Sequence, residues 1–402
     1  MTKPGSRLAA DIEALSAIER PSASPGEEAA ARWVHSRFDE LGLTAEIEHF
    51  RFNPDYWTVW GAHGAIVALA ACLVPLGRRA ARVGALISGL AAVSFWGDLT
   101  TEFHLLRRLL PARSSYNVLA RLPNPGASRL LIVSAHHDAP HSGLVFHPAM
   151  FRTMARLLGT QKEPPSPLRL PFGAMLAVTA GATARSLGID GKMPGRLVFQ
   201  GGLLGAAFAA LMRDIGQGEV SPGANDNASG VAVLLALAEA LAREPLPELE
   251  VWFLSTGSEE GILGGMQAFM KRHRSELDGR RPFVLNLEVV GSGRTTYMEG
   301  EGFLRRYPYY QEAVALASEV ASEPPFTSVN SLGTAPFATD ALIATRYGVP
   351  AITVASLNDE GYVPHYHWPS DTPETVDLRS VESTYAFCHR LIERLAEKTQ
   401  SP

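Results

Sequence analysis

Five side chains of types that commonly bind metal ions follow short apolar runs in this chain. They are His136 in SAHHDAP, Asp226 in GANDNASG, Glu260 in STGSEEGILGG, Glu288 in LNLEVVG and His367 in HYHWPSDT. Two imidazoles and three carboxylates, with one carboxylate shared, supply enough donors for two adjacent zinc ions and leave room for a bridging water. These residues therefore predict a two-zinc catalytic centre.

The first motif also contains a candidate supporting group. Asp138 lies two residues after His136, on the same side of an extended chain. A carboxylate there can accept the second imidazole N–H and fix the tautomer, as partners of metal-bound histidines commonly do. An isolated H-x-D sequence is more often an ordinary strand end. We expect His137, His141 and His147 to lie in surface loops.

Two adjacent glutamates, Glu259 and Glu260, follow a predicted strand at 249–254. Neighbouring carboxylates repel each other unless a cation or a shared proton relieves them, although a solvated acidic turn is the ordinary alternative. A pair that follows an apolar strand favours a division of roles. We predict that Glu260 binds metal and that Glu259 stays free as the general base that takes a proton from water.

The other ligand candidates each have an alternative role. Asp226 precedes a predicted helix at 227–243 and could cap it rather than bridge two cations. Glu288 ends a strongly apolar strand, where a buried charge needs either a cation or an arginine partner. His367 lies in a loop rich in Tyr, Pro and Trp, where His365 competes for the same role.

Four further residues are weaker candidates. Asp340 either orients His367 or caps the helix that follows it, and capping is the expected role. Asp371 is expected to anchor the loop that holds His367. Tyr362 and Tyr366 are candidates for the substrate pocket, with packing of the loop as the alternative.

The motifs must be positioned by a regular alternation of strands and helices. Apolar periodicity predicts strands at 45–52, 116–122, 129–135, 249–254, 283–290 and 350–355, and helices at 6–20, 26–42, 227–243, 262–274, 309–321 and 378–397. This alternation predicts an α/β fold with a mixed, mostly parallel central sheet between helices. Ligands of such folds bind at the carboxyl ends of strands, where four of the motifs fall.

Four charge-free stretches interrupt the alternation, at 57–76, 83–97, 170–184 and 197–212. The first is long enough to cross a bilayer of about 30 Å. The spacing of Gly64 and Ala68, and of Gly201 and Gly205, suits close contact between helices in lipid. We predict two membrane-embedded helical hairpins, with an apolar lid or an oligomer interface on a soluble enzyme as the alternative.

These stretches divide the chain. We expect one catalytic domain made of residues 1–56, 98–140 and 220–402, interrupted by a hairpin at 57–97 and by an insertion at 141–219 that contains the second hairpin. The segments that flank each hairpin can rejoin because a hairpin leaves and returns on the same side.

The basic residues give conflicting signals about membrane orientation. Three arginines in the loop 77–82 place that loop in the cytoplasm and the catalytic domain outside it. The opposite is favoured by the lack of a recognisable secretory signal and by four basic residues, Arg152, Arg156, Lys162 and Arg169. We expect an integral, multi-pass membrane protein whose catalytic domain is extracytoplasmic.

Composition excludes several other classes. The chain has 402 residues and a formal net charge of −5, without the basic patch that nucleic-acid binding requires. Its two cysteines, Cys72 and Cys388, are too few for a disulfide framework. The expected partners are a peptide substrate, membrane lipid and a second copy of the chain packed through the apolar helices.

Together the motifs resemble peptidase family M28, the co-catalytic di-zinc aminopeptidase and glutamate carboxypeptidase group. The resemblance covers most of the chain outside the apolar pairs, including RPSASPGEEAAARWVHSRFDELGL. It implies a zinc-exopeptidase (phosphorylase/hydrolase-like) fold, two zinc ions and hydrolysis near a peptide terminus, with aminopeptidase activity expected first. By resemblance, His136 and Glu288 would hold one zinc, Glu260 and His367 the other, and Asp226 would bridge them.

The family pattern also assigns supporting roles. Glu259 matches its general base, Asp138 matches the partner of the first histidine, and H-x-x-x-D-T selects His367 over His365. The chain departs from the pattern at three positions: Asn225 replaces an acid, Glu288 replaces a common Asp and His137 replaces a common Tyr. The alternative functions are a catalytically inactive M28-like membrane scaffold and a single-zinc acyltransferase similar to glutaminyl cyclases.

Overall fold

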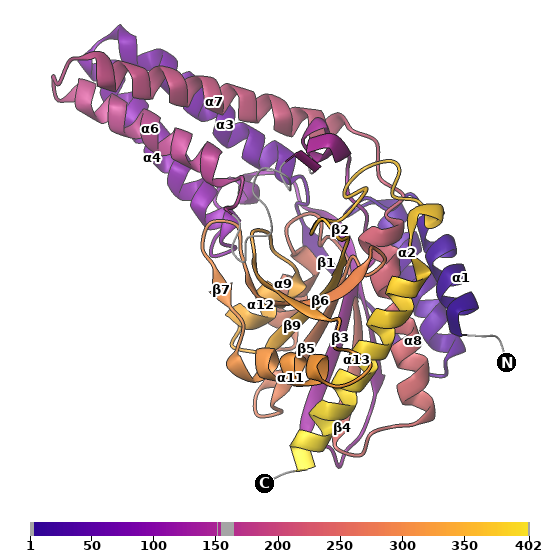
Figure 1. The fold of residues 1–402 in the computed structure, drawn as a ribbon. Helices are drawn as coiled ribbons and strands as arrows, with labels where there is room; N and C mark the ends of the chain where they lie inside the picture. The colour runs from indigo at the N-terminus through magenta and orange to yellow at the C-terminus, as the bar shows by residue number, and fades with distance from the viewer. Residues whose placement is uncertain (1–3, 151, 154–164, 401–402) are drawn as a thin grey trace.

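The computed structural model describes residues 4–150, 152–153 and 165–400. An α/β part is built around one sheet, and a bundle of four long helices projects from one end of it (Figure 1). The strands are β1 (Thr44–Phe52), β2 (Arg113–Leu122), β3 (Arg129–His136), β4 (Leu249–Thr256), β5 (Pro282–Glu288), β6 (Arg294–Glu301), β7 (Tyr307–Pro308), β8 (Asn330–Ala335) and β9 (Ala351–Leu357).

The helices belong to these same two parts. Those of the α/β part are α1 (Pro4–Ser16), α2 (Pro25–Glu40), α8 (Ser229–Arg243), α9 (Gly264–Arg272), α10 (Arg274–Leu277), α11 (Gln311–Ser322), α12 (Asp340–Arg346) and α13 (Leu378–Gln400). Those of the bundle are α3 (Tyr56–Leu73), α4 (Arg78–Leu99), α6 (Arg169–Ser186) and α7 (Lys192–Gln217).

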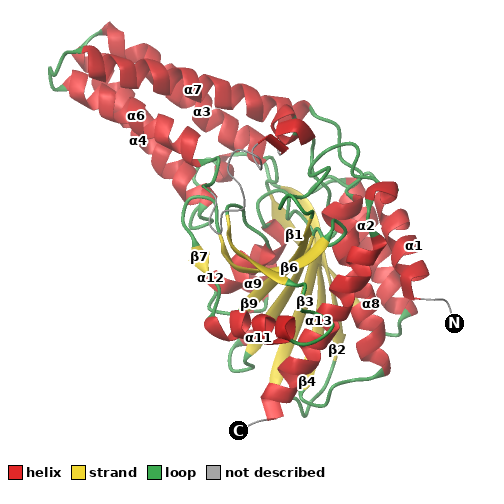
Figure 2. Cartoon of the chain, viewed as in Figure 1, coloured by secondary structure: helices red, strands yellow, loops and turns green. Residues whose placement is uncertain are grey.

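The sheet is mixed. Its strand order is β1-β2-β4-β3-β5-β9-β6-β7, and β8 pairs with β6. The central strands β4, β3, β5 and β9 are parallel, whereas β1 and β2 on one side and β6 and β7 on the other pair antiparallel. Helices α2, α8 and α13 cover one face, and α9 and α12 cover the other (Figure 2). This arrangement confirms the predicted fold class.

The register of the central strands aligns the ends that carry the chemistry. Every residue of β3 is buried, as a parallel strand covered by helices on both faces requires. Ser134 of β3 pairs with Asn286 of β5, so that His136 and Glu288 lie level at the ends of neighbouring strands. Because side chains alternate along a strand, these two residues also share one face. His136 pairs with Thr256, the last residue of β4.

Strands β6 and β8 lie where the sequence predicted no strand. β6 has the sequence RTTYMEGE, whose polar residues hide its apolar alternation. Glu301 at its end is fully buried and accepts hydrogen bonds from the Thr339 backbone N–H (2.6 Å) and the Tyr309 hydroxyl (2.6 Å). These contacts join β6 to the start of α12 and satisfy a polar group that burial alone would penalise.

Glu301 makes the stability of the fold depend on pH. Burial raises the pKa of this carboxyl to about 8, against the opposing hydrogen bonds from Tyr309 and Thr339. Because this value lies above the ordinary 4.5, the stability that Glu301 contributes is fully present below pH 4.5 and is lost as the pH rises through 8. The melting temperature of Glu301→Gln, relative to wild type, should therefore be several degrees higher at pH 9 than at pH 5.

Thermal unfolding in detergent at the two pH values checks this prediction. Glu299→Gln is the control, since Glu299 lies on the same strand but is exposed. A Glu301→Gln difference that is the same at pH 5 and pH 9 would contradict it.

The four long helices form a single bundle. α3 packs on α4 and α7, and α6 packs on the same two helices. A Cβ atom added at Gly64 would lie 2.6 Å from the Gly205 carbonyl oxygen, so glycine at this position allows α3 and α7 to approach closely. The His63 imidazole contacts the Ser94 hydroxyl at 2.9 Å and joins α3 to α4 inside the bundle.

The outer surface of the bundle is apolar. Leu86 and Leu90 on α4 are 64% and 59% exposed, and Phe199 and Leu203 on α7 are 72% and 62% exposed. In the described part of the chain, α3, α4 and α7 are long and apolar enough to cross a membrane by length and composition, and α6 is not. Large exposed apolar surfaces of this kind mark contact with lipid or with another protein.

Candidate metal centre

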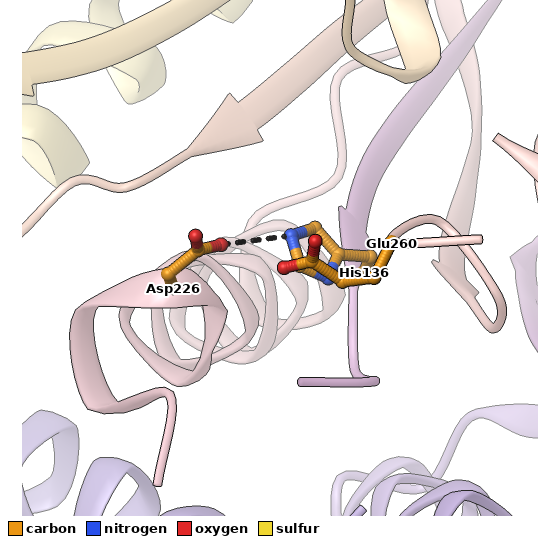
Figure 3. Close-up of side chains that lie close together, drawn as sticks. All are labelled: His136, Asp226 and Glu260. Carbon is orange, nitrogen blue, oxygen red and sulfur yellow. Dashed lines mark ion pairs between the residues drawn. The ribbon is translucent and has the colours of Figure 1, made fainter. Parts of the chain in front are cut away.

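All five predicted ligands meet at the carboxyl edge of the sheet. His136 Nε2 lies 3.2 Å from Asp226 Oδ1 and 3.2 Å from Glu288 Oε1. His367 Nε2 lies 3.3 Å from Asp226 Oδ2 and 3.2 Å from Glu260 Oε2. Figure 3 shows Asp226, on the turn before α8, facing His136 at the end of β3, with Glu260 beside the imidazole. The two oxygens of Asp226 therefore face two different histidines.

The donor set fits zinc. Tetrahedral zinc with bonds of about 2.0 Å separates its ligand atoms by roughly 3.3 Å, which the four distances match. His136, Asp226 and Glu260 each offer a ligand atom within 4.8 Å of the others. Among the described residues, Asp226 Oδ2 and Glu260 Oε1 are buried without a hydrogen-bond partner. Buried carboxylate oxygens normally have such partners, and a cation would take their place here.

The electrostatics of the ligands favour a bound cation. Burial raises the pKa of Glu260 well above its usual range, and the nearby Asp226 carboxylate adds to this effect. Burial and the Glu288 carboxylate likewise raise the pKa of Glu259. Burial would also raise the pKa of Asp226, but the facing imidazoles of His136 and His367 hold it below its ordinary value. Divalent cations relieve such repulsion between carboxylates.

Asp138 holds the first histidine and the glutamate loop together. Its Oδ1 lies 3.4 Å from His136 Nδ1 and accepts the Glu259 backbone N–H at 3.1 Å. Its Oδ2 accepts the Glu260 backbone N–H at 3.2 Å and the Ser22 hydroxyl at 2.5 Å. Glu259 Oε2 lies 4.0 Å from His136 Nε2, close to the ligands but outside their contact distances.

Asp371 has the anchoring position expected for it. Its two carboxylate oxygens accept the backbone N–H groups of Asn225 (2.8 Å) and Asp226 (3.0 Å). Burial raises the pKa of this carboxyl to about 7. The loop of His367 is thereby tied to the turn that carries the shared carboxylate.

Two supporting residues were not recognised from the sequence. Arg20 is fully buried and donates to the carbonyl oxygens of His137 (2.7 Å), Pro222 (2.6 Å) and Gly223 (2.7 Å), so it joins the loops of His136 and Asp226. Glu27 accepts the Ser258 backbone N–H at 2.9 Å, next to Glu259. Each looks like an ordinary helix-flanking charge in the sequence, and only its burial shows its role.

The predictions for His137 and Asp340 are wrong, whereas the choice of His367 over His365 agrees with the structure. His137 is not at the surface but fully buried, with Nδ1 2.9 Å from the Ser255 hydroxyl. Asp340 begins α12, but its side chain accepts the Thr256 hydroxyl at 2.5 Å instead of capping the helix, and Thr339 is the N-cap residue. His365 contacts the Ser370 hydroxyl at 2.6 Å, which leaves His367 to face the other ligands.

The two candidate tyrosines differ in position. Tyr366 stacks on the His367 ring, with centroids 3.9 Å apart. Burial raises the pKa of Tyr366 well above its usual range, and the charges of Asp226 and Glu260 add to the shift. Tyr362 closes a turn with Asn358: its carbonyl oxygen accepts the Asn358 backbone N–H, and its own N–H donates to Asn358 Oδ1. Phe146 also packs on His367, with the two ring centroids 4.5 Å apart.

Known proteins share segments of this sequence. Residues 212–392 match the model of peptidase family M28. Endoplasmic reticulum metallopeptidase 1 of Rattus norvegicus is 31% identical over 169 residues, which cover 40% of this chain and 18% of that protein. Aminopeptidase YwaD of Bacillus subtilis (strain 168) is 42% identical over 74 residues, which cover 18% of this chain and 16% of that protein. The matched segments span less than a fifth of these curated relatives.

Solved structures share the fold. BSAP, a zinc aminopeptidase from Bacillus subtilis, superposes with a TM-score of 0.57 at 14% identity, covering 97% of this chain and 95% of that chain. At that identity the likeness concerns the fold alone. The segment matched by the family model contains Asp226, Glu259, Glu260, Glu288 and His367. This segment is therefore similar in sequence to peptidase family M28, and the mixed sheet that supports it shares its fold with a zinc aminopeptidase.

Proposed function

We propose that this protein is a membrane-bound di-zinc exopeptidase that removes residues from the amino terminus of peptides. The position of Asp226 carries the proposal, because its two oxygens lie 3.2 and 3.3 Å from two different histidines. His136, Glu288 and Asp226 would hold one zinc, and His367, Glu260 and Asp226 the other. Relatives named aminopeptidases support the choice of substrate.

The residues of the chain divide the chemistry among them. Bound zinc supplies a Lewis acid that polarises a scissile carbonyl and makes a water molecule more acidic. Glu259 takes the proton from that water and later gives it to the leaving amine. Its position suits this role, because Glu259 Oε2 lies 4.0 Å from His136 Nε2, beside the ligands. Asp138 holds the backbone of Glu259 in place.

Hydrolysis of aminoacyl-4-nitroanilides tests the reaction. We expect turnover by the purified protein in detergent, loss of turnover with a chelator and recovery when zinc is added back. A parallel panel of N-acetylated peptides with free carboxyl termini separates the two exopeptidase modes. Hydrolysis of that panel alone would replace the aminopeptidase assignment with a carboxypeptidase one, and no hydrolysis of either panel would contradict the proposed function.

The number of zinc ions separates this proposal from its two alternatives. A di-zinc hydrolase binds two ions per chain, whereas a single-zinc acyltransferase similar to glutaminyl cyclases binds one. A catalytically inactive scaffold would hydrolyse neither panel at any zinc content. The buried, unpartnered oxygens of Asp226 and Glu260 favour two ions, since one ion on His136 would leave the carboxylate beside His367 without a cation.

The bundle is the membrane anchor in this proposal, and carbonate extraction tests that role. We expect the protein to stay in the membrane pellet after sodium carbonate at pH 11 and to enter the supernatant in detergent. The apolar exposed faces of α4 and α7 cause this result, because exposure of Leu86, Leu90, Phe199 and Leu203 to water is unfavourable. Release by carbonate alone would contradict membrane insertion.

The tip of the bundle supports an extracytoplasmic catalytic part. The loops at this tip lie against each other, since a Cβ atom at Gly188 would meet the Arg78 guanidinium at 2.7 Å. Six basic residues gather there: Arg78, Arg79, Arg82, Arg185, Lys192 and Arg196. Basic residues favour the cytoplasmic side, which places the α/β part opposite.

Two of the residues that favoured the reverse orientation, Arg156 and Lys162, lie outside the described residues. Protease added to intact cells should digest the α/β part. Digestion only after lysis would reverse the orientation.

A further inference from the structure

The loop that carries Glu259 and Glu260 has a strained backbone. Ser258, Ile262 and Leu263 have φ angles of 48°, 81° and 60°. Positive φ is unfavourable for residues with a side chain and most unfavourable for a β-branched one such as Ile262. Such conformations persist only where surrounding contacts hold them. Asp138 and Glu27 hold the start of this loop, and the contacts that hold its second half come from the base of the helical bundle.

Arg107 makes the polar part of this contact. Its Nη1 donates to the Gly261 carbonyl oxygen (3.0 Å) and to the Asn53 carbonyl oxygen (2.6 Å). Its Nε and Nη2 donate to both oxygens of Asp98, at 2.9 and 2.7 Å. Arg107 is 4% exposed and Asp98 is 1% exposed. Gly261 directly follows Glu260, so one guanidinium joins the ligand loop to Asp98.

Asp98 belongs to the bundle. It lies near the end of α4 and also accepts the Trp60 indole N–H of α3 at 2.8 Å. The paired charges therefore fix the ends of two bundle helices to each other. Because the planar guanidinium directs donors at both Asp98 and Gly261, a shift of α4 would move the ligand loop.

An apolar contact reinforces the polar one. The Ile262 side chain is 7% exposed and packs in the same apolar cluster as Trp60 and Val59 of α3. Gly261 lies against Pro54, just before α3, where an added Cβ would come within 2.6 Å of the proline Cβ. The two residues after Glu260 are thus packed on the bundle.

We infer that Arg107 is a positioning residue for the metal centre, through which the bundle sets the geometry of the Glu259–Glu260 loop. The consequence for catalysis rests on the proposed function. The consequences for zinc affinity and for the mobility of the loop do not depend on it.

Arg107→Lys tests the inference. Lysine keeps a positive charge beside Asp98, but its single nitrogen cannot serve both Asp98 oxygens and two carbonyl groups at once. We expect zinc affinity, measured by chelator competition, to fall about 10-fold, the lower end for loss of a group that supports metal ligands. We also expect kcat to fall about 10-fold with little change in KM.

Hydrogen exchange gives a readout independent of activity. The backbone N–H groups of Ile262 and Leu263 bond to the Glu259 carbonyl oxygen at 2.9 and 2.7 Å, and that of Gly264 bonds to the Ser258 carbonyl oxygen at 2.8 Å. All three should exchange at least about 10-fold faster in Arg107→Lys if loss of the contact frees the loop.

Arg129→Lys is the matched control. Arg129 is also buried, at 9% exposed, and pairs with Glu312, but it begins β3 at the far end of the sheet. We expect this variant to match wild type in zinc affinity, in kcat and in the exchange of the three loop amides.

A second variant covers the case in which Arg107→Lys does not fold. Asp98→Asn with Arg107→Gln removes both charges together and leaves no unpaired buried ion. It should show the same faster exchange and weaker zinc binding.

Loop exchange and zinc affinity equal to those of Arg129→Lys, in whichever variant folds, would overturn the inference. If wild type hydrolyses neither peptide panel, the proposed function fails, whereas exchange and zinc affinity still decide the role of Arg107.

Discussion

The Glu259→Gln variant should keep both zinc ions and lose about 10²- to 10⁴-fold in kcat, the usual range for removal of a general base. Glutamine has nearly the same shape as glutamate, and the backbone N–H of residue 259 would still donate to Asp138. The variant therefore removes the proton acceptor without disturbing the ligands. In the wild type, Glu259 Oε2 lies 4.0 Å from His136 Nε2, farther than the four ligand atoms that face the two histidines.

Hydrolysis of an aminoacyl-4-nitroanilide measures kcat, and zinc analysis of the same sample measures how many ions the variant keeps. Glu360→Gln is the control, since Glu360 is an exposed carboxylate on the loop after β9. Full activity in Glu259→Gln would remove Glu259 from the mechanism. Loss of zinc would instead make Glu259 a ligand and would require a new assignment for Glu260.

The sequence predicts the central strands and the ligand residues for a common physical reason. β3, β4 and β5 are covered on both faces, so each is an apolar run, and a charged residue directly after such a run is conspicuous. His136 and Glu288 stand out in this way. β6 does not, because Thr295, Thr296 and Glu301 are buried through polar contacts that the sequence pattern does not show.

Contacts between distant segments set the limit of prediction from sequence. Glu27 lies 231 residues from Ser258, whose backbone N–H it accepts. The carbonyl oxygen of Gly261 lies 154 residues from the Arg107 side chain that donates to it. Every residue has a backbone carbonyl, so the sequence does not indicate which of them accepts a hydrogen bond from a distant side chain. Composition predicts the apolar helices, but only the three-dimensional structure shows their contact with the loop that carries Glu259 and Glu260.

Asp226→Asn should abolish binding of both zinc ions rather than one. Asp226 has one oxygen beside each histidine, and asparagine offers a neutral oxygen and an amide N–H in their place. Metal affinity should fall by more than about 100-fold at both sites, beyond the usual cost of losing a supporting group. Zinc content after dialysis against a weak chelator, with hydrolysis measured on the same sample, checks the loss.

The fold should survive this change, which makes the measurement interpretable. Asp226 takes part in the fold through its backbone N–H, which donates to Asp371 and is retained in the variant. His367→Ala is the matched comparison, because it removes one donor from the Glu260 side only. It should release one zinc and keep the one held by His136 and Glu288. If Asp226→Asn also kept one zinc, the shared carboxylate would belong to a single ion, and the two-zinc centre would have to be rebuilt without a bridge.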